Sequence, residues 1–180
     1  MKVIPANLNG LFVIQPKVFE DARGYFFESY NQDVFRKHGL IEEFIQDNES
    51  LSQKGVLRGL HCQNPPHAQA KLVRVITGAV LDVVVDIRKK SITYGKHFSL
   101  TLSASNKTML YVPVGFAHGF VVLEDNTIFS YKCSHTYNKV SEDGVLWCDE
   151  DLAIDWGIKN PTLSEKDRIA KRFRDFESKF

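Results

Sequence analysis

The sequence has 180 residues, a length that suits a single domain, and we expect residues 1–180 to form one unit. Lysine and arginine total 23 against 22 acidic residues, so no overall positive charge favours nucleic acid or an anionic membrane. No apolar run approaches the roughly 20 residues needed to cross a bilayer, and residues 1–10 lack the apolar core of a signal peptide. The three cysteines have no CxxC spacing, which is typical of reduced thiols and predicts a cytoplasmic protein.

The N-terminal segment combines aromatic, cationic and amide side chains that suit a ligand. Residues 19–28 bring Arg23 and Glu28 together with a run of aromatics. An arginine can hold a phosphate through two parallel hydrogen bonds, and aromatic faces suit a base or a sugar ring. An exposed loop with an edge strand explains the same residues. If the next segment is extended, Gln46 and Asn48 share a face and offer amide donors and acceptors.

After a helix predicted at about residues 32–38 and ended by Gly39, apolar and polar residues alternate along the chain. In residues 79–88, the apolar side chains at 81, 83, 85 and 87 share one face and polar side chains occupy the other, which predicts a half-buried strand. Further strands are predicted at 71–77, 98–103, 109–112, 119–123, 127–133 and 145–149. Turn signals rich in Gly, Pro, Asn and Asp separate these strands at short intervals.

A second helix is predicted after Ser164. Residues 164–167 resemble a capping box with Asp167 in place of Glu or Gln, and apolar residues recur at helical spacing through residue 179. A doubly wound nucleotide fold is disfavoured, because no GxGxxG follows a strand and no GxxxxGK[ST] loop is present. The many short strands predict an all-β double-sheet sandwich or jelly roll, with short helices at its periphery and a C-terminal helix.

The densest polar segment is residues 57–63, followed by Lys71 at the start of a strand. Alternation places His61 on one face and Arg58 on the other, unless a bulge or bend re-aims the arginine. An imidazole has an ordinary pKa near roughly 6.5 and suits general-base work, although a structural or surface histidine is commoner. Taken alone, Lys71 fits a solvated strand-end charge, and Tyr131 fits a packing residue in its strand.

A second cluster lies at residues 112–120, where two glycines bracket His118 in a tight turn that can face a cavity. Its P-x-G-x-x-H spacing also occurs in cupin barrels, where this histidine often binds a metal. The other cupin half-motif needs an H-x-H pair, but His61 is followed by Cys62 and Gln63. The sequence therefore predicts no metal site.

Together these segments resemble the dTDP-4-dehydrorhamnose 3,5-epimerase family over nearly the whole chain. The residues that carry the resemblance lie at 16–19, 21–28, 44–48, 56–61, 71–74, 85–88, 113–120 and 163–167. The resemblance implies a cupin-type jelly roll, usually a homodimer, that works without a metal or other cofactor. It implies an isomerase that inverts carbons 3 and 5 of dTDP-4-keto-6-deoxy-D-glucose, both beside the ketone at carbon 4, on the route to L-rhamnose.

By resemblance, four residues carry the catalysis. His61 matches the family's base, and Asp167 matches the carboxylate that orients and charges it. Lys71 matches the cation beside the carbonyl oxygen, where it stabilises the enolate. Tyr131 matches the acid that returns a proton on the opposite face, and His118 matches a residue that lines the sugar pocket.

The resemblance also implies a nucleotide site. The residues placed around the diphosphate and thymidine are Arg23, Glu28, Gln46, Asn48 and Arg58, with Phe19 and Phe26 as walls. Tyr137 lies near the position where family members stack an aromatic ring on thymine, although the alignment is loose by one residue. In the family the N-terminal strand crosses to the neighbouring subunit of the homodimer, so Arg23 and Glu28 are expected to serve the partner's site.

Three alternatives stand beside the double epimerase. A single-centre epimerase on the same or a related nucleotide sugar keeps the histidine and the aspartate, and the presence of Tyr131 favours double inversion without settling it. A catalytically silent sugar-binding cupin predicts the loss of His61, Asp167 or Tyr131, and all three are present. A metal-dependent cupin needs the missing H-x-H pair.

Overall fold

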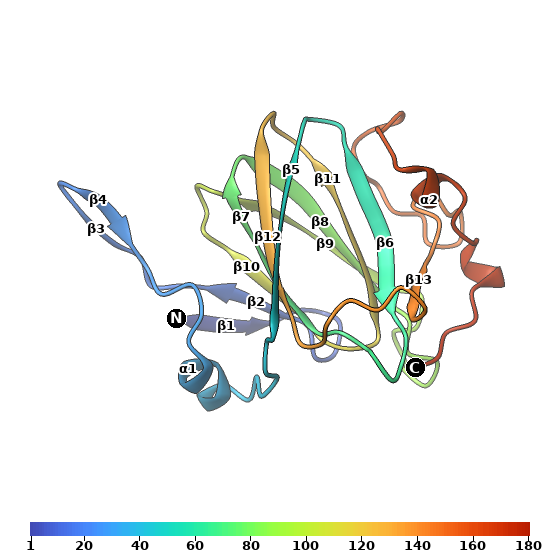
Figure 1. Ribbon diagram of the computed structural model, residues 1–180, viewed down its shortest axis with the longest axis horizontal. Coiled ribbons are helices and arrows are strands. Elements are labelled where there is room, and N and C mark those ends of the chain that lie inside the picture. Colours follow the sequence, from blue (N-terminus) through green and yellow to red (C-terminus); the bar gives the residue numbers. More distant parts are fainter.

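The chain folds into two facing β-sheets, with a hairpin arm at one end and the C-terminal segment at the other (Figure 1). A computed structural model describes all of residues 1–180. The six-stranded sheet contains, in spatial order, β1 (Lys2–Pro5), β2 (Phe12–Gln15), β10 (Met109–Val112), β7 (Lys71–Thr77), β12 (Thr127–Cys133) and β5 (Gln46–Ser52). The five-stranded sheet contains β13 (Glu142–Gly144), β6 (Leu57–Gln63), β11 (Phe116–Val122), β8 (Ala79–Asp86) and β9 (His97–Ser103). The arm is formed by β3 (Phe19–Asp21) and β4 (Gly24–Phe26).

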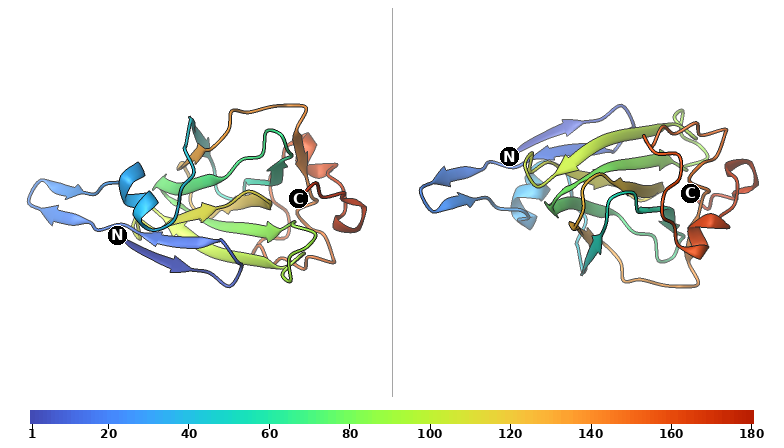
Figure 2. Two further views of the ribbon diagram at one scale, coloured as in Figure 1. Left: turned by 90° about the horizontal axis from the view of Figure 1, so that it is seen from below. Right: turned by 90° about the horizontal axis from the view of Figure 1, so that it is seen from above.

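The strand pairings are antiparallel, and the two sheets lie face to face as the layers of a jelly roll (Figure 2). This all-β fold with short helices confirms the predicted fold class. A cluster of 13 buried residues fills much of the space between the sheets, including Val73, Val84, Phe120 and Phe129. Burial of apolar surface, worth about 25 cal/mol per Å², holds the layers together. Polar side chains occupy other inner positions of the same strands, where they face a cavity.

β8 is buried on both faces, contrary to the half-buried strand predicted for residues 79–88. Its odd-numbered apolar side chains pack outward into a second cluster, to which the C-terminal segment contributes Trp156 and Phe176. Its even-numbered side chains point between the sheets, and Asp82 among them is fully buried. This face of the strand is therefore buried between the sheets, where Val80 and Val84 join the apolar core and Asp82 is paired with His118.

The C-terminal segment is mostly irregular, so the long C-terminal helix predicted through residue 179 is wrong. The segment contains a single helical turn, α2 (Glu165–Arg168), and a later 3-10 turn, Phe173–Asp175. Between them the carbonyl of Lys171 accepts a hydrogen bond from the N–H of Leu146, and the N–H of Phe173 donates to Asp149. These bonds to residues 146–149 of the same chain replace helical ones. They allow Phe176 to be buried against the outer face of the five-stranded sheet.

The strand predicted at 145–149 is also wrong, because β13 ends at Gly144 and the pairing beyond it stops at Val145, which bonds to the backbone of Leu60 and bridges to Lys171. The carbonyl of Trp147 accepts from the indole of Trp156 at 2.8 Å instead of pairing with a strand. The strands predicted at 71–77, 109–112 and 127–133 are confirmed with their bounds, and those at 98–103 and 119–123 are confirmed with shifted ends.

The first predicted helix is confirmed as α1 (Gln32–Lys37). Asn31 caps its start with its side-chain oxygen, and Gly39 follows its end at a φ of +80°. Phe35 is buried on the outer face of the six-stranded sheet. No helix in the chain has the length and apolar character required to cross a membrane.

Candidate active site

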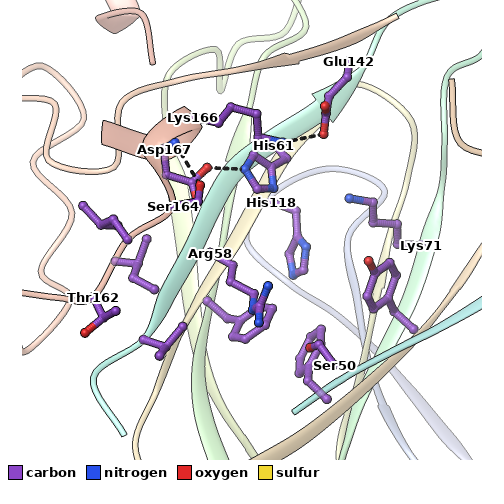
Figure 3. A pocket seen from close by; sticks show the side chains of 16 residues that line it. Ser50, Arg58, His61, Lys71, His118, Glu142, Thr162, Ser164, Lys166 and Asp167 are labelled. Carbon is purple, nitrogen blue, oxygen red and sulfur yellow. Dashed lines mark hydrogen bonds and ion pairs between the residues drawn. The ribbon is translucent and has the colours of Figure 1, made fainter. Parts of the chain in front are cut away.

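A cavity of about 700 Å³ lies between the two sheets and is walled by residues from both (Figure 3). Its polar lining residues are Ser50, Arg58, His61, Lys71, His118, Tyr131, Glu142, Thr162, Ser164, Lys166 and Asp167. All four predicted catalytic residues are among them. Two of the predicted binding residues, Arg58 and His118, line the same cavity.

His61 and Asp167 are in direct contact, although 106 positions separate them in the chain. The ring Nε2 lies 2.5 Å from Oδ1 of Asp167. The aspartate side chain is only 4% exposed and the histidine 28%, so the carboxylate is shielded while the ring reaches the cavity. Burial raises the pKa of Asp167, but the hydrogen bond with His61 and its charge outweigh burial and leave this pKa below its usual value. A carboxylate in this position fixes one imidazole tautomer and stabilises an imidazolium.

Ser164 caps α2 and leaves the carboxylate of Asp167 free to serve the histidine. The Ser164 hydroxyl accepts a hydrogen bond from the backbone N–H of Asp167 at 3.2 Å, as the predicted capping box requires. The carboxylate of Asp167 points toward His61 (Figure 3). The cap and the histidine contact therefore coexist, because the backbone of Asp167 makes one and its side chain the other.

A bulge in β6 turns Arg58 and His61 toward the same cavity. His61 pairs with His118 of β11, and Arg58 pairs two residues further along β11, so three steps on β6 match two on β11. Gly59 occupies the bulge at a φ of +131°, and a Cβ there would lie 2.5 Å from the Cα of Gly119. The added residue cancels the alternation that would otherwise have placed Arg58 on the outer face.

Lys71 and Tyr131 approach the cavity from the sheet opposite His61. They lie in β7 and β12, adjacent strands of the six-stranded sheet, whereas His61 lies in β6 of the five-stranded sheet. The ammonium of Lys71 lies 5.9 Å from the centre of the Tyr131 ring. Burial lowers the pKa of Lys71 and raises the pKa of Tyr131. The phenol is therefore protonated at neutral pH and is able to donate a proton.

A second imidazole–carboxylate pair forms part of the wall beside His61. Nε2 of His118 lies 2.9 Å from Oδ2 of Asp82, and both side chains are buried. Burial raises the pKa of Asp82, with His118 opposing the shift. The ring of His118 also stacks on Phe129, with 6.1 Å between centroids. These contacts fix the orientation of the His118 ring at the cavity. In the whole chain, no group of three His, Cys, Asp or Glu side chains is placed to hold a metal ion.

Glu142 and Lys166 line the cavity and were missed in the sequence. Lys166 donates to Glu142 at 2.6 Å, and the hydroxyl of Tyr137 donates to the other carboxylate oxygen at 3.1 Å. Burial raises the pKa of Glu142, but the hydrogen bond and charge of Lys166 outweigh burial and leave this pKa lowered. Lys166 adjoins Asp167 inside the capping-box pattern, a signal that could have found it. Glu142 lies in no recognisable motif.

The arm residues predicted to bind the nucleotide do not line the cavity of their own chain. Arg23 is 90% exposed and pairs with Asp21 at 2.6 Å inside the arm. Phe19 and Phe26 are exposed on the same hairpin, and Glu28 is exposed where the arm rejoins the body. Figure 1 shows the arm extending away from the two sheets.

Three further predicted binding residues lie next to the cavity without lining it. Gln46 and Asn48 share the inner face of β5 with Ser50, which does line the cavity. Gln46 accepts from the backbone N–H of Tyr137 at 2.8 Å and donates to Asn48 at 3.0 Å. These bonds join β5 to the loop that carries Tyr137 and form a polar edge beside the cavity.

Known proteins are similar to this chain over nearly its whole length. A family model described as dTDP-4-dehydrorhamnose 3,5-epimerase matches residues 5–175. A protein of that name from Shigella flexneri is 51% identical over 97% of each chain. The crystal structure of one from Elizabethkingia anophelis has a TM-score of 0.93 and 53% identity, and covers 97% of both chains. A Legionella pneumophila 3,5-epimerase in complex with dTDP-4-keto-L-rhamnose has a TM-score of 0.94 and 43% identity, over 98% of this chain and 94% of that one.

Proposed function

Because the chain belongs to the dTDP-4-dehydrorhamnose 3,5-epimerase family and is thus an isomerase, we propose that it converts dTDP-4-keto-6-deoxy-D-glucose into dTDP-4-keto-L-rhamnose by inverting carbons 3 and 5. One observation supports the assignment of roles above all. An imidazole with a buried carboxylate partner and a protonated phenol line one cavity from opposite sheets. Inversion at a carbon requires a base on one face and an acid on the other, and the cavity offers one from each sheet.

His61 is the proposed base. The protons on carbons 3 and 5 are acidic because both carbons flank the ketone, so the electron pair of each broken C–H bond moves into an enolate. Nε2 of His61 is engaged by Asp167, which leaves Nδ1 to accept the proton. Asp167 stabilises the imidazolium that forms and does not itself become protonated.

Lys71 is the proposed partner of the enolate oxygen. Its burial lowers the cost of bringing its ammonium against a developing negative charge, because little water remains to be displaced at that moment. His118, held by Asp82 and Phe129, is proposed to position the sugar beside it. Removal of a comparable preorganised donor lowers the rate by about 10²–10³-fold.

Tyr131 is the proposed acid. As the enolate electrons return to carbon, a new C–H bond forms with the phenolic proton on the face opposite His61, and a phenolate remains. The raised pKa of Tyr131 keeps the phenol protonated before the step, as a general acid requires. The stereochemical change thus follows from the placement of acid and base on different sheets.

We also propose a homodimer in which the arm of one subunit reaches the cavity of the other. The arm extends from the body and exposes Phe19 and Phe26, apolar surface that a second copy would remove from water. Arg23 and Glu28 lie away from the cavity of their own chain and would supply charged contacts to the partner's nucleotide.

The nucleotide itself is proposed to lie along the edge between β5 and β6. Arg58 lines the cavity and suits the diphosphate. Gln46 and Asn48 offer amide groups to thymine, and Tyr137, 56% exposed, offers a ring to stack on it. We propose that residues 1–180 act as one unit in the cytoplasm, which the three free thiols support.

Proton NMR of dTDP-4-keto-6-deoxy-D-glucose in heavy water with the purified protein tests this proposal. We expect deuterium at both carbons 3 and 5 of the product, and none at either carbon with the His61→Ala variant. Deuterium at one carbon would instead identify a single-centre epimerase. Exchange that survives in His61→Ala would remove His61 from the role of base, and equal dTDP binding by both proteins would exclude a folding defect.

A further inference from the structure

Glu142 lies where the proposed thymine subsite meets the turn that carries Asp167. One of its carboxylate oxygens accepts a hydrogen bond from the ammonium of Lys166 at 2.6 Å, and the other accepts from the hydroxyl of Tyr137 at 3.1 Å. Lys166 immediately precedes Asp167 in α2. Figure 3 shows Glu142, Lys166 and Asp167 grouped around His61. A single side chain therefore joins the loop of Tyr137 to the turn that serves the proposed base.

The backbone of the Tyr137 loop is held separately by two glutamines. The side-chain oxygen of Gln63 accepts from the N–H of Asn138 at 2.8 Å, and its amide donates to the carbonyl of Thr136 at 3.0 Å. The N–H of Tyr137 itself donates to Gln46 at 2.8 Å. These bonds fix the loop but leave the aromatic ring free to turn. The hydroxyl of the ring bonds only to the carboxylate described above, so this carboxylate sets the direction of the ring.

The turn α2 depends on contacts with the rest of the fold, because it has only four residues and helices this short are marginal alone. The ion pair of Lys166 with Glu142 joins α2 to β13, and β13 pairs with β6, the strand of His61. The place of Asp167 against His61 therefore depends on where this ion pair holds the turn. A misplacement of about 1 Å near the chemistry can lower a rate by about 100-fold.

From these contacts, and resting on the proposed function, we infer that Glu142 is a positioning residue whose single carboxylate aligns the ring that receives thymine and the turn that carries Asp167. The contact with Tyr137 orients the ring, and the contact with Lys166 holds Asp167 against His61. Burial raises the pKa of Glu142, but the contacts with Lys166 outweigh burial, so the carboxylate stays charged at neutral pH. Binding of the nucleotide and alignment of the base thus share one anchor.

The variants Glu142→Ala and Glu142→Gln separate the two contacts. Alanine removes both, whereas glutamine keeps an oxygen for the Tyr137 hydroxyl but loses the charge that pairs with Lys166. Asp143→Ala is the matched control. Asp143 is the next residue of β13, its side chain is 21% exposed against 23% for Glu142, and it pairs with Lys171 of the same C-terminal segment.

Calorimetry measures the affinity and the stoichiometry of dTDP binding for each protein, and kcat for the keto sugar is expressed per dTDP site. A smaller folded fraction of a variant therefore does not lower its kcat. Glu142→Ala should bind dTDP about fivefold more weakly and should lower kcat about tenfold, because it loses two hydrogen bonds to a charged group at a partly exposed site. Glu142→Gln should regain the wild-type dTDP affinity but not the wild-type kcat, and Asp143→Ala should match the wild type in both.

Tyr137→Phe removes only the hydroxyl and tests the first contact from its other side. It should bind dTDP as weakly as Glu142→Ala, and the double variant should bind no more weakly than either single variant. A wild-type kcat in Glu142→Gln, a wild-type dTDP affinity in Glu142→Ala, or equal losses in Asp143→Ala would overturn the inference and leave the proposed function intact. A wild-type protein that neither binds dTDP nor inverts the sugar would overturn both.

Discussion

The charge of Asp167 is expected to contribute most of the stabilisation of the protonated base, and Asp167→Asn isolates that charge. Asparagine keeps the size and an oxygen acceptor, and the cap of α2 survives because Ser164 bonds to the backbone N–H at this position. Two unit charges about 4 Å apart interact by about 4 kcal/mol at an effective dielectric constant of about 20. His61 is 28% exposed, so water screens part of this energy, and about 3–4 kcal/mol is a fair expectation. That energy corresponds to a fall in kcat of about 10²–10³-fold.

The assay measures kcat as the initial rate of epimerisation at saturating substrate. The affinity for dTDP is measured separately by calorimetry. KM and dTDP binding should change little, because the lost interaction forms only once the imidazole takes the proton. Asp155→Asn, at an exposed position in the C-terminal segment, is the matched control and should behave as wild type. A fall in kcat of less than about tenfold would refute the assigned role of Asp167.

Three further outcomes are expected. Gly59→Ala should lower the free energy of unfolding, measured by urea titration, by about 3 kcal/mol or more. The added Cβ would lie 2.5 Å from the backbone of Gly119, and residue 59 has a φ of +131° that alanine rarely adopts. A loss under about 1 kcal/mol would show that the bulge relaxes freely. Lys71→Met should lower kcat by about 10²–10³-fold with dTDP affinity retained, and wild-type kcat would exclude Lys71 from enolate stabilisation. Asp86 is buried, which raises its pKa, but hydrogen bonds led by that from Arg88 bring the pKa to about 2. The unfolded state therefore binds more protons than the folded state between the two pKa values, and stability falls as pH falls toward 2. The stability difference between wild type and Asp86→Asn should shrink by about 1–2 kcal/mol from pH 5 to pH 2, and a constant difference would contradict this origin.

Alternation predicted strands such as 98–103, and runs rich in β-branched and aromatic residues predicted others such as 71–77 and 127–133, which together form much of the double-sheet core. The same pattern gave the wrong environment for Asp82. Period two separates the faces of a strand but does not say whether the polar face meets water or is buried, as it is here where Asp82 pairs with His118. The C-terminal helix failed for a related reason, since aromatic residues at helical spacing are also buried by an irregular chain pinned by Asp149 and Lys171.

The site was predicted through resemblance more than through residue chemistry. His61, Lys71 and Tyr131 are each unremarkable as single residues, and only the assembled fold places them around one cavity. The bulge that aligns Arg58 with His61 depends on the pairing of β6 with β11, which local sequence does not reveal. Glu142 was missed because its importance comes from contacts with Tyr137 and Lys166 in space.

The 106-residue separation between His61 and Asp167 has a consequence for the newly made chain. The strand that bears the histidine leaves the ribosome long before the turn that bears the aspartate. Domains gain their structure during or after synthesis at about 5–20 residues per second, so several seconds separate the two events. Until the C-terminal segment docks on the outer face of the sheet, the chain holds a cavity whose base lacks its carboxylate. Epimerase activity is therefore a late signal of folding, and its appearance in a refolding experiment times the docking of that segment.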